Sequence, residues 1–241
     1  MKNAGIIIIG NEILSGKVAD KNSPYLCKEL RKLGVEVQQI ITIPDITEII
    51  GQAAVDFSDR FNWVFTSGGI GPTHDDVTVA SIAKGFNTEL YESPEIMQAI
   101  YSYHGEKMTS AHRRMAMIPI GSELIEYVEG RAPQLQFHNI FVLPGIPEYL
   151  QIRFSGIKER FQTTPIALKE IFLKADEGII AEILDSTLEL FPELMLGSYP
   201  NVTGEDHEIK LTLECRDSIY LEKAFNFLYE KLPREYILDD E

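Results

Sequence analysis

The sequence predicts an α/β protein with an open, mostly parallel β-sheet that carries helices on both faces, followed by a small α+β domain. Residues 5–9 (GIIII) form an apolar, largely β-branched run, which is typical of a strand buried on both faces. Strand-like and helix-like patterns then alternate as far as residue 161, as they do in open parallel sheets. After residue 161 the order becomes strand, helix, strand, strand, helix, strand, which is the split βαβ order.

The first domain, residues 1–161, opens with three pairs of a strand and a helix. We expect strands at 5–9, at 35–43 and from 63, and helices at 22–33, at 46–59 and from 77. Asn22 or Ser23 can cap the first long helix with Pro24 at its first position, and Gly34 ends it.

The rest of this domain follows from local start and stop signals. We expect a single helix at 93–117, a short strand at 123–127, a turn at 130–133, a strand at 138–143 and a helix from 147. Ser93 is a good cap for the first of these helices, with Pro94 at its first position. The charged stretch His112-Arg113-Arg114 can either reach over the ligand cleft or face solvent, and we favour solvent.

The second domain, residues 166–241, follows a linker at 162–165. We expect strands at 167–173, 193–199, 207–215 and 236–238, helices at 178–190 and 218–232, a turn at 201–206 and a frayed acidic tail at 239–241. These elements form a small α+β unit.

Composition excludes several classes of partner. The chain has 241 residues, of which 44% are hydrophobic and 24% charged, as in ordinary globular proteins. Its net charge of −15 argues against nucleic acid or an anionic membrane as partner. Cys27 and Cys215 have no metal-ligand spacing, and the apolar run near the N-terminus is far shorter than a secretion signal. We therefore expect a cytoplasmic protein.

The most distinctive stretch follows the predicted strand at 63. It reads SGGIGPTHDDVT and contains Gly68, Gly69, Gly71, Pro72, Thr73, His74, Asp75 and Asp76. Glycines allow positive φ and let backbone N–H groups approach an anion. Asp75 or Asp76 can cap a helix that begins near Val77, whereas the other carboxylate has no evident structural duty. That surplus favours a divalent cation beside a bound phosphate, although an ordinary glycine turn with one capping aspartate is the alternative.

Polar residues also follow the other predicted strands. Glu12, Asp20 and Asn22 come after the first strand, Asp45 after the second and Gly145 after the strand at 138–143. Ligands of open α/β sheets collect outside the carboxyl ends of the strands, so we expect these residues at one rim. Aspartates that share a rim repel one another unless a cation compensates. We expect Mg²⁺, Mn²⁺ or Co²⁺ at Asp75 and Asp76, with His74 as a tentative ligand because a lone loop histidine is more often an exposed hydrogen-bonding group.

Three segments carry a family resemblance. SGGIGPTHDDVT resembles the GGxGPTxDDxT signature of the CinA-type (competence/damage-inducible protein A) branch of the molybdopterin-binding MoaB/Mog-like family. GNEILSGKVADKN and LPGIPE resemble that family's GxELLxGxxxDTN and LPGxPxE segments. The chain departs from the family where Gln134 follows Pro133, since many CinA sequences are expected to carry a glycine there.

The resemblance implies a MoaB/Mog-like fold, self-association into a homo-oligomer and a nucleotide or pterin phosphate as ligand. It implies a ligand loop of Gly68, Gly69, Gly71, Pro72 and Thr73, an acidic set of Asp45, Asp75 and Asp76, and contributions from Asp20 and Asn22. The nicotinamide-nucleotide deamidase domain of full-length CinA has no counterpart among the predicted elements, so deamidation is not expected.

Three functions remain open, with an enzyme favoured. The first is metal-dependent hydrolysis of a nucleotide pyrophosphate such as ADP-ribose or FAD, with Asp45 and Asp76 as catalytic residues. The second is molybdopterin binding or adenylylation, and the third is a non-catalytic module that senses a nucleotide. No serine or cysteine arrangement of the hydrolytic kind and no GxxxxGK[ST] motif competes with this reading.

Overall fold

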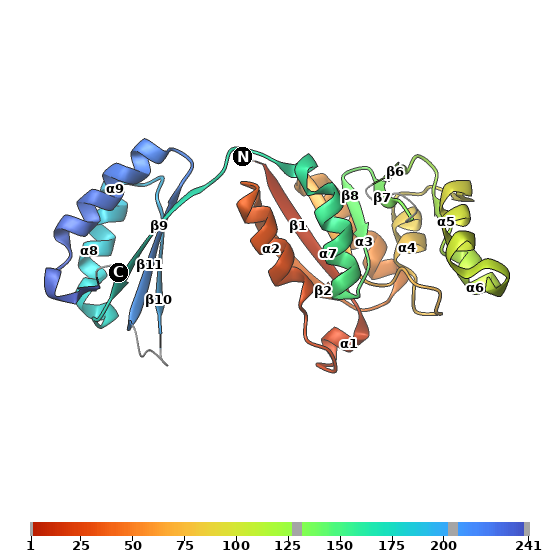
Figure 1. Cartoon of the computed structure of the whole chain (residues 1–241), viewed down its shortest axis with the longest axis horizontal. Helices are drawn as coiled ribbons and strands as arrows, with labels where there is room; N and C mark the ends of the chain where they lie inside the picture. The colour runs from red at the N-terminus through yellow and green to blue at the C-terminus, as the bar shows by residue number, and fades with distance from the viewer. Residues whose placement is uncertain (1, 127–131, 202–206, 239–241) are drawn as a thin grey trace. The chain divides into compact units, whose positions relative to one another are not determined.

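The structure is a computed structural model that describes residues 2–126, 132–201 and 207–238. The chain forms two compact units, Met1–Thr163 and Thr164–Glu241, whose elements are labelled in Figure 1. No helix among the described residues is long and apolar enough to cross a membrane.

The first unit is built on a six-stranded sheet in the order β2-β1-β3-β8-β7-β6. Its strands are β1 (Asn3–Ile9), β2 (Glu36–Ile43), β3 (Trp63–Ser67), β6 (Glu123–Ile125), β7 (Gln134–Phe137) and β8 (Ile140–Leu143). β2, β1, β3 and β8 run parallel, while β7 and β6 are antiparallel. Ile9 is opposite Ile43, and Ser67 is opposite Leu143, so these four strands end at one edge. The predicted fold class is confirmed, but β7 was not among the predicted strands.

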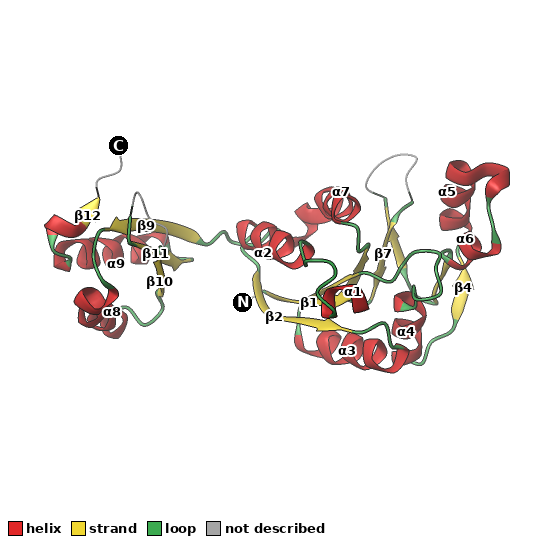
Figure 2. Cartoon of the chain, turned by 90° about the horizontal axis from the view of Figure 1, so that it is seen from below, coloured by secondary structure: helices red, strands yellow, loops and turns green. Residues whose placement is uncertain are grey.

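Helices cover both faces of this sheet, as Figure 2 shows. The helices that follow the parallel strands are α1 (Asn11–Leu14), α2 (Asn22–Lys32), α3 (Thr47–Arg60), α4 (Thr78–Gly85) and α7 (Pro147–Ile157). Residues alternate along β1, so Ile6 and Ile8 pack with α2 and α7 while Ile7 and Ile9 pack with α3 and α4. Both sets are almost completely buried, which explains the continuous isoleucine run.

The single helix predicted over 93–117 is wrong. The structure has α5 (Pro94–His104), a 3₁₀ turn (Gly105–Lys107), α6 (Ser110–Arg114) and β5 (Met117–Pro119), which pairs with β4 (Leu90–Glu92). Ser93 does cap α5, because its side chain accepts a hydrogen bond from the amide of Ile96. The helix ends at Gly105, whose φ is 55°, and Thr109 caps a new helix. The predicted strand at 123–127 is β6 as far as Ile125, and residues 127–131, including the first half of the predicted turn at 130–133, lie outside the described residues.

The second unit is a four-stranded antiparallel sheet in the order β10-β11-β9-β12 with two helices. Its elements are β9 (Ala167–Leu173), α8 (Glu177–Leu190), β10 (Met195–Pro200), β11 (Ile209–Cys215), α9 (Ser218–Lys231) and β12 (Ile237–Leu238). Ile171, Leu211 and Leu213 alternate toward a buried cluster shared with the helices. The split βαβ order is confirmed, while residues 202–206 and 239–241 of the predicted turn and tail lie outside the described residues.

Candidate functional site

The glycine loop after β3 lies where four parallel strands end. The amide of Gly68 donates to the carbonyl oxygen of Leu143 at 3.2 Å. Gly68 has φ 112°, and a methyl group on it would overlap the carbonyl oxygen of Ile9. A methyl group on Gly145 would lie 3.3 Å from the Cα of Gly68. Only glycine lets the loop pass this closely between the ends of β1 and β8.

Some amides of this loop are free to bind a ligand, but that of Gly68 is not. The expectation that the Gly68 N–H group faces a ligand is wrong, because Leu143 accepts its hydrogen bond. Within the described part of the chain, the amides of Gly69, Ile70 and Gly71 have no hydrogen-bond partner. The anion cradle therefore begins one residue later than predicted.

Thr73, Asp75 and Asp76 form a compact oxygen cluster. The Thr73 hydroxyl lies 2.5 Å from Oδ1 of Asp75 and 2.6 Å from Oδ2 of Asp76. The amide of Thr73 also donates to Oδ2 of Asp76 at 2.8 Å. The Thr73 hydroxyl holds the pKa of the exposed Asp75 below its ordinary value, with a smaller contribution from the backbone amide of Asp75. Two carboxylates thus converge on one hydroxyl at the loop surface.

Neither aspartate caps the following helix, so that prediction is wrong. α4 begins at Thr78, and its N-cap residue, Val77, makes no side-chain capping bond. Asp76 instead turns back toward the loop, where a methyl group on Gly71 would lie 2.7 Å from its Oδ2. The Thr78 hydroxyl donates to the carbonyl oxygen of Gly68 at 2.8 Å and holds the loop against the helix. Both carboxylates therefore remain available for a ligand.

His74 does not complete a metal centre in this structure. Its side chain is 98% exposed, and its Nδ1 lies 3.9 Å from Oδ1 of Asp75. Across the residues that the structure describes, no group of three or more His, Cys, Asp or Glu side chains is arranged to hold a metal ion by itself. The expectation that four carboxylates gather around one cation is therefore wrong.

Asp45 and Glu12 lie at the same sheet edge, and both contact the loop that follows β1. Oδ2 of Asp45 accepts a hydrogen bond from the amide of Asn11 at 2.8 Å, which joins the ends of β1 and β2. The Glu12 carboxylate packs over Gly10, at 2.5 Å from the position that a methyl group would take there. β1 separates Asp45 from the glycine loop, a span of about 10 Å for two strand spacings.

Asp20 and Asn22 shape the loop between β1 and α2. The Asp20 carboxylate accepts from the amides of Asn22 and Ser23 at 2.9 and 3.0 Å and also from the Ser23 hydroxyl. The Asp20 carboxylate therefore satisfies the first amides of α2 from the position before the N-cap residue, Lys21, and the predicted caps, Asn22 and Ser23, are wrong because the helix already includes them.

Asn22 is buried and ties three segments together. Its Nδ2 donates to Oγ of Ser67 at 2.9 Å and to the carbonyl oxygen of Gly145 at 2.7 Å. Its Oδ1 is buried without a hydrogen-bond partner among the described residues. With 7% of its surface exposed, Asn22 positions the ends of β3 and β8, and contact with a ligand stays a prediction.

Arg114 follows the less favoured of the two predictions for the stretch 112–114. Its Nη2 donates to the carbonyl oxygen of Pro72 at 2.9 Å, so α6 reaches back to the glycine loop. Arg113 pairs with Glu92, and His112 forms a capping box with Thr109. The expectation that this stretch only faces solvent is wrong. A contact across 42 positions leaves no local signal that sequence patterns reveal.

These features define a parallel α/β protein whose sheet carries, at its carboxyl edge, a glycine-rich loop with free amides and the carboxylates of Asp75 and Asp76. A family model described as "Probable molybdopterin binding domain" matches residues 5–162, and one described as "FAD synthase, middle domain" matches residues 165–241. The chain belongs to the molybdopterin-binding MoaB/Mog-like family, in its CinA-type branch.

Three relatives illustrate this placement. A "Probable FAD synthase" of Caenorhabditis briggsae is 31% identical over 96% of this chain and 50% of that protein. A "CinA-like protein" of Thermotoga maritima is 29% identical over 96% of this chain and 59% of that protein. The chain thus spans only half or somewhat more of the length of these two relatives. The crystal structure of CinA from Thermoplasma acidophilum is 30% identical, with a TM-score of 0.62 over 67% of this chain and 100% of that one.

Proposed function

We propose that this protein hydrolyses a nucleotide pyrophosphate of the ADP-ribose or FAD class with the help of a divalent metal. Relatives named as probable FAD synthases match almost the whole chain, and its second unit matches the FAD synthase middle domain. These names support an enzyme that acts on nucleotides. The more specific reaction rests on the geometry of the glycine loop.

One observation carries the proposal. The Thr73 hydroxyl has a single proton, yet two carboxylate oxygens lie 2.5 and 2.6 Å from its oxygen. Only one of these contacts can be a hydrogen bond from that hydroxyl at a time, so the paired negative charges of Asp75 and Asp76 lack full compensation. A cation that prefers oxygen ligands would supply the missing positive charge.

The residues present suit Mg²⁺ or Mn²⁺ that is shared with water and substrate. They are too few to enclose a cation with protein ligands alone. Mg²⁺ is commonly held by one or two carboxylates together with water and substrate phosphate oxygens. Asp75, Asp76 and the Thr73 hydroxyl supply two carboxylates and one neutral oxygen. The metal would neutralise charge on the pyrophosphate and lower the pKa of bound water.

The chain's own groups would do the remaining work. Amides of Gly69, Ile70 and Gly71 would donate to phosphate oxygens and fix the pyrophosphate. Asp45 keeps Oδ1 without a partner in the described structure while Asn11 orients its other oxygen, so it can accept a proton from the attacking water. Arg114 holds the loop by its bond to Pro72. A pyrophosphate laid across the end of β1 would span the gap between the loop and Asp45.

The test is AMP release from ADP-ribose and from FAD with Mg²⁺, Mn²⁺ and Co²⁺. We expect Asp76→Asn to lower kcat by at least 100-fold, within the range for a lost catalytic or metal-binding carboxylate. Asp185→Asn on α8 is the matched control, because this exposed aspartate belongs to the second unit. Absence of AMP from the native protein under all three metals would overturn the proposal.

The same variant separates catalysis from sensing. A sensing module would bind the nucleotide with the same affinity in Asp76→Asn as in the native protein. The native protein would then show no turnover for the variant to lose. Loss of turnover with the fold intact by circular dichroism supports hydrolysis.

Molybdopterin binding is a second candidate, favoured by the description of the family and by the apolar rim beside the loop. Ile146 and Tyr149, which follow Gly145, are 54% and 52% exposed. A pterin ring stacks on such a surface. Calorimetry with molybdopterin at tens of micromolar tests this candidate, and the absence of heat would remove it.

A further inference from the structure

The first unit has a hollow of about 660 Å³ at the opposite edge of its sheet. It is lined by Ser58, Asn62, Trp63, Gln136, His138, Asn139, Phe141, Arg160 and Phe161. Trp63 begins β3 and Asn139 precedes β8, so the hollow lies at the amino ends of strands whose carboxyl ends carry the glycine loop. Its volume is within the range of pockets for small ligands.

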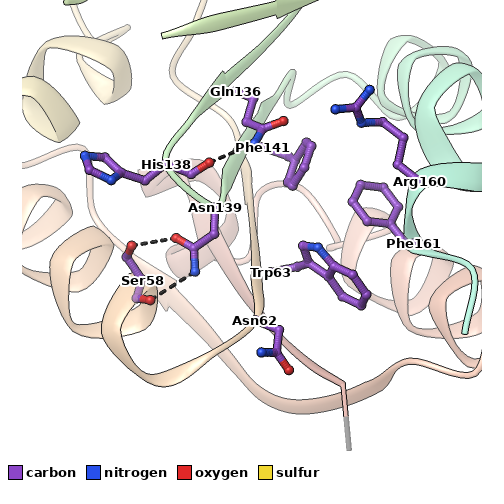
Figure 3. A pocket seen from close by; sticks show the side chains of 9 residues that line it. All are labelled: Ser58, Asn62, Trp63, Gln136, His138, Asn139, Phe141, Arg160 and Phe161. Carbon is purple, nitrogen blue, oxygen red and sulfur yellow. Dashed lines mark hydrogen bonds between the residues drawn. The ribbon is translucent and has the colours of Figure 1, made fainter. Parts of the chain in front are cut away.

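The turn between β7 and β8 is fixed against the end of α3. Oδ1 of Asn139 accepts from the Ser58 hydroxyl at 2.5 Å, and its Nδ2 donates to the carbonyl oxygen of Ser58 at 3.0 Å (Figure 3). Nδ2 also donates to the carbonyl oxygen of Phe61 at 2.7 Å. His138, which has φ 51°, stacks on Phe86 with ring centroids 4.9 Å apart. Both Nδ2 protons of Asn139 and one of the two acceptor positions of its Oδ1 are used within the protein, so the residue builds the wall of the hollow.

An aromatic surface forms another wall. The indole of Trp63 is partly exposed, and its ring centroid lies 5.5 Å from that of the buried Phe161. Phe161 in turn packs edge-on against Phe141 at 4.8 Å. Nζ of Lys2 lies 5.7 Å from the Trp63 ring centroid. Trp63 is therefore held rigidly and still offers area on which a flat ring can stack.

The charge of the hollow is opposite to that of the whole chain. None of its nine lining residues is acidic, although 37 of the 241 residues are Asp or Glu. Arg160 is exposed and makes no ion pair or hydrogen bond within the described structure. Gln136 donates through Nε2 to the carbonyl oxygen of His138 at 2.8 Å, while its buried Oε1 has no partner there. A free guanidinium is an anion ligand, and an unpaired amide oxygen accepts from a hydroxyl group.

We propose that this hollow is a second ligand site, which binds a nucleoside monophosphate. The base would stack on Trp63, the phosphate would pair with Arg160, and a sugar hydroxyl would donate to Oε1 of Gln136. In Figure 3 the Gln136 and Arg160 head groups lie toward one end of the hollow, and Trp63 and Asn62 lie toward the other. One free arginine without a glycine cradle fits a single phosphate rather than a pyrophosphate.

Trp63 is the only tryptophan of the chain, so its fluorescence reports on the hollow directly. Titrating the full chain with AMP should change its emission in a saturable way. Adenosine, which lacks the phosphate, and ribose 5-phosphate, which lacks the base, should each bind at least tenfold more weakly. Equal binding of ribose 5-phosphate and AMP, or no binding of AMP, would overturn the inference.

Two variants locate the binding. Arg160→Gln should weaken AMP binding at least tenfold, while leaving adenosine binding unchanged, because the guanidinium contacts only the phosphate. Asp76→Asn, at the other edge, should leave AMP binding to the hollow unchanged. The opposite pattern, with AMP binding altered by Asp76→Asn and not by Arg160→Gln, would assign AMP to the glycine loop and refute the second site. Because Arg160 is exposed and unpaired, its replacement should leave the fold intact, which circular dichroism verifies.

Discussion

Replacing Gly68 with alanine tests whether the glycine loop owes its position to close backbone packing. At φ 112° an alanine is strained by about 1–2 kcal/mol. Its methyl group would overlap the carbonyl oxygen of Ile9 and lie 3.2 Å from the carbonyl carbon. Ile9 belongs to a buried strand held on both sides, so the loop must move instead. Forced overpacking of this kind costs about 1–3 kcal/mol.

Movement of the loop also breaks the hydrogen bond from Gly68 to Leu143, which contributes about 1 kcal/mol. We therefore expect Gly68→Ala to lower the free energy of unfolding by about 3–6 kcal/mol. Gly16→Ala is the matched control. Gly16 also has a positive φ, 71°, but a methyl group there meets nothing within 4 Å. The control should lose only about 1–2 kcal/mol.

Urea unfolding followed by tryptophan fluorescence measures both variants in the first unit alone, because the only tryptophan, Trp63, lies there. With a slope near 2 kcal/mol/M, the midpoint should fall by about 1.5–3 M for Gly68→Ala and by less than about 1 M for Gly16→Ala. Equal losses in the two variants would refute the reasoning. They would show that positive φ alone, without contact to Ile9, explains the glycine.

Three further predictions concern the oxygen cluster at Thr73, the buried side chain of Asn22 and the core of the second unit. Thr73→Val should raise the pKa of Asp75 toward its ordinary value, which NMR titration measures, and an unchanged pKa would contradict this. The stabilisation from the lowered pKa is present above the ordinary value and lost as pH falls through the lowered one; it should shrink in this variant to the part that the backbone amide of Asp75 supplies. Asn22→Ala removes the hydrogen bonds to Ser67 and Gly145 and should lower the free energy of unfolding, measured with urea, by about 2–3 kcal/mol. A loss under about 1 kcal/mol would contradict the role of Asn22 in joining these segments. Leu211→Ala, at a site with 0% exposure, should destabilise the second unit by about 2–5 kcal/mol, measured by hydrogen exchange, with Thr212→Ala as the control. An equal shift of the unfolding transition that Trp63 fluorescence reports in the first unit would contradict independent unfolding of the two units.

The parallel strands could be predicted from the sequence because a strand buried on both faces is a continuous apolar run. β1 is an isoleucine run, and its alternate residues fill two different cores. β7 was missed because four residues with alternating glutamine and apolar side chains give little signal beside the Pro133 turn. The helix over 93–117 was overextended because a glycine inside a helical pattern is compatible with both continuation and termination. Its positive φ decides for termination, and φ is not visible in sequence.

In the candidate site, too, features set by neighbouring residues were predicted, and those set by side-chain direction or tertiary packing were not. The residues of the glycine loop are neighbours in sequence, so their composition alone indicated an anion cradle. The direction of the Asp76 side chain was not predictable, since capping α4 and folding back onto Thr73 both suit an aspartate at that position. The structural role of Asp20 was missed for a related reason, because α2 already begins at Asn22, so that its N-cap residue is Lys21 and Asp20 directly precedes it. Arg114 depends on the placement of α6, which follows from tertiary packing.

The two edges of the first sheet explain why its two proposed sites can be tested apart. Trp63 and Ser67 are the first and last of the five residues of β3, a rise of about 13 Å along the strand. The carboxyl edge presents paired aspartates and free amides, to which the proposed function assigns a cation and a phosphate anion together. The hollow at the amino edge presents an arginine and an indole, and none of its nine lining residues carries a carboxylate, so the proposed second site takes an anion with a flat ring. Groups this far apart with no shared partner act additively, so Asp76→Asn and Arg160→Gln should combine without coupling. A coupling energy between them would instead mean that one extended ligand or a conformational change joins the edges.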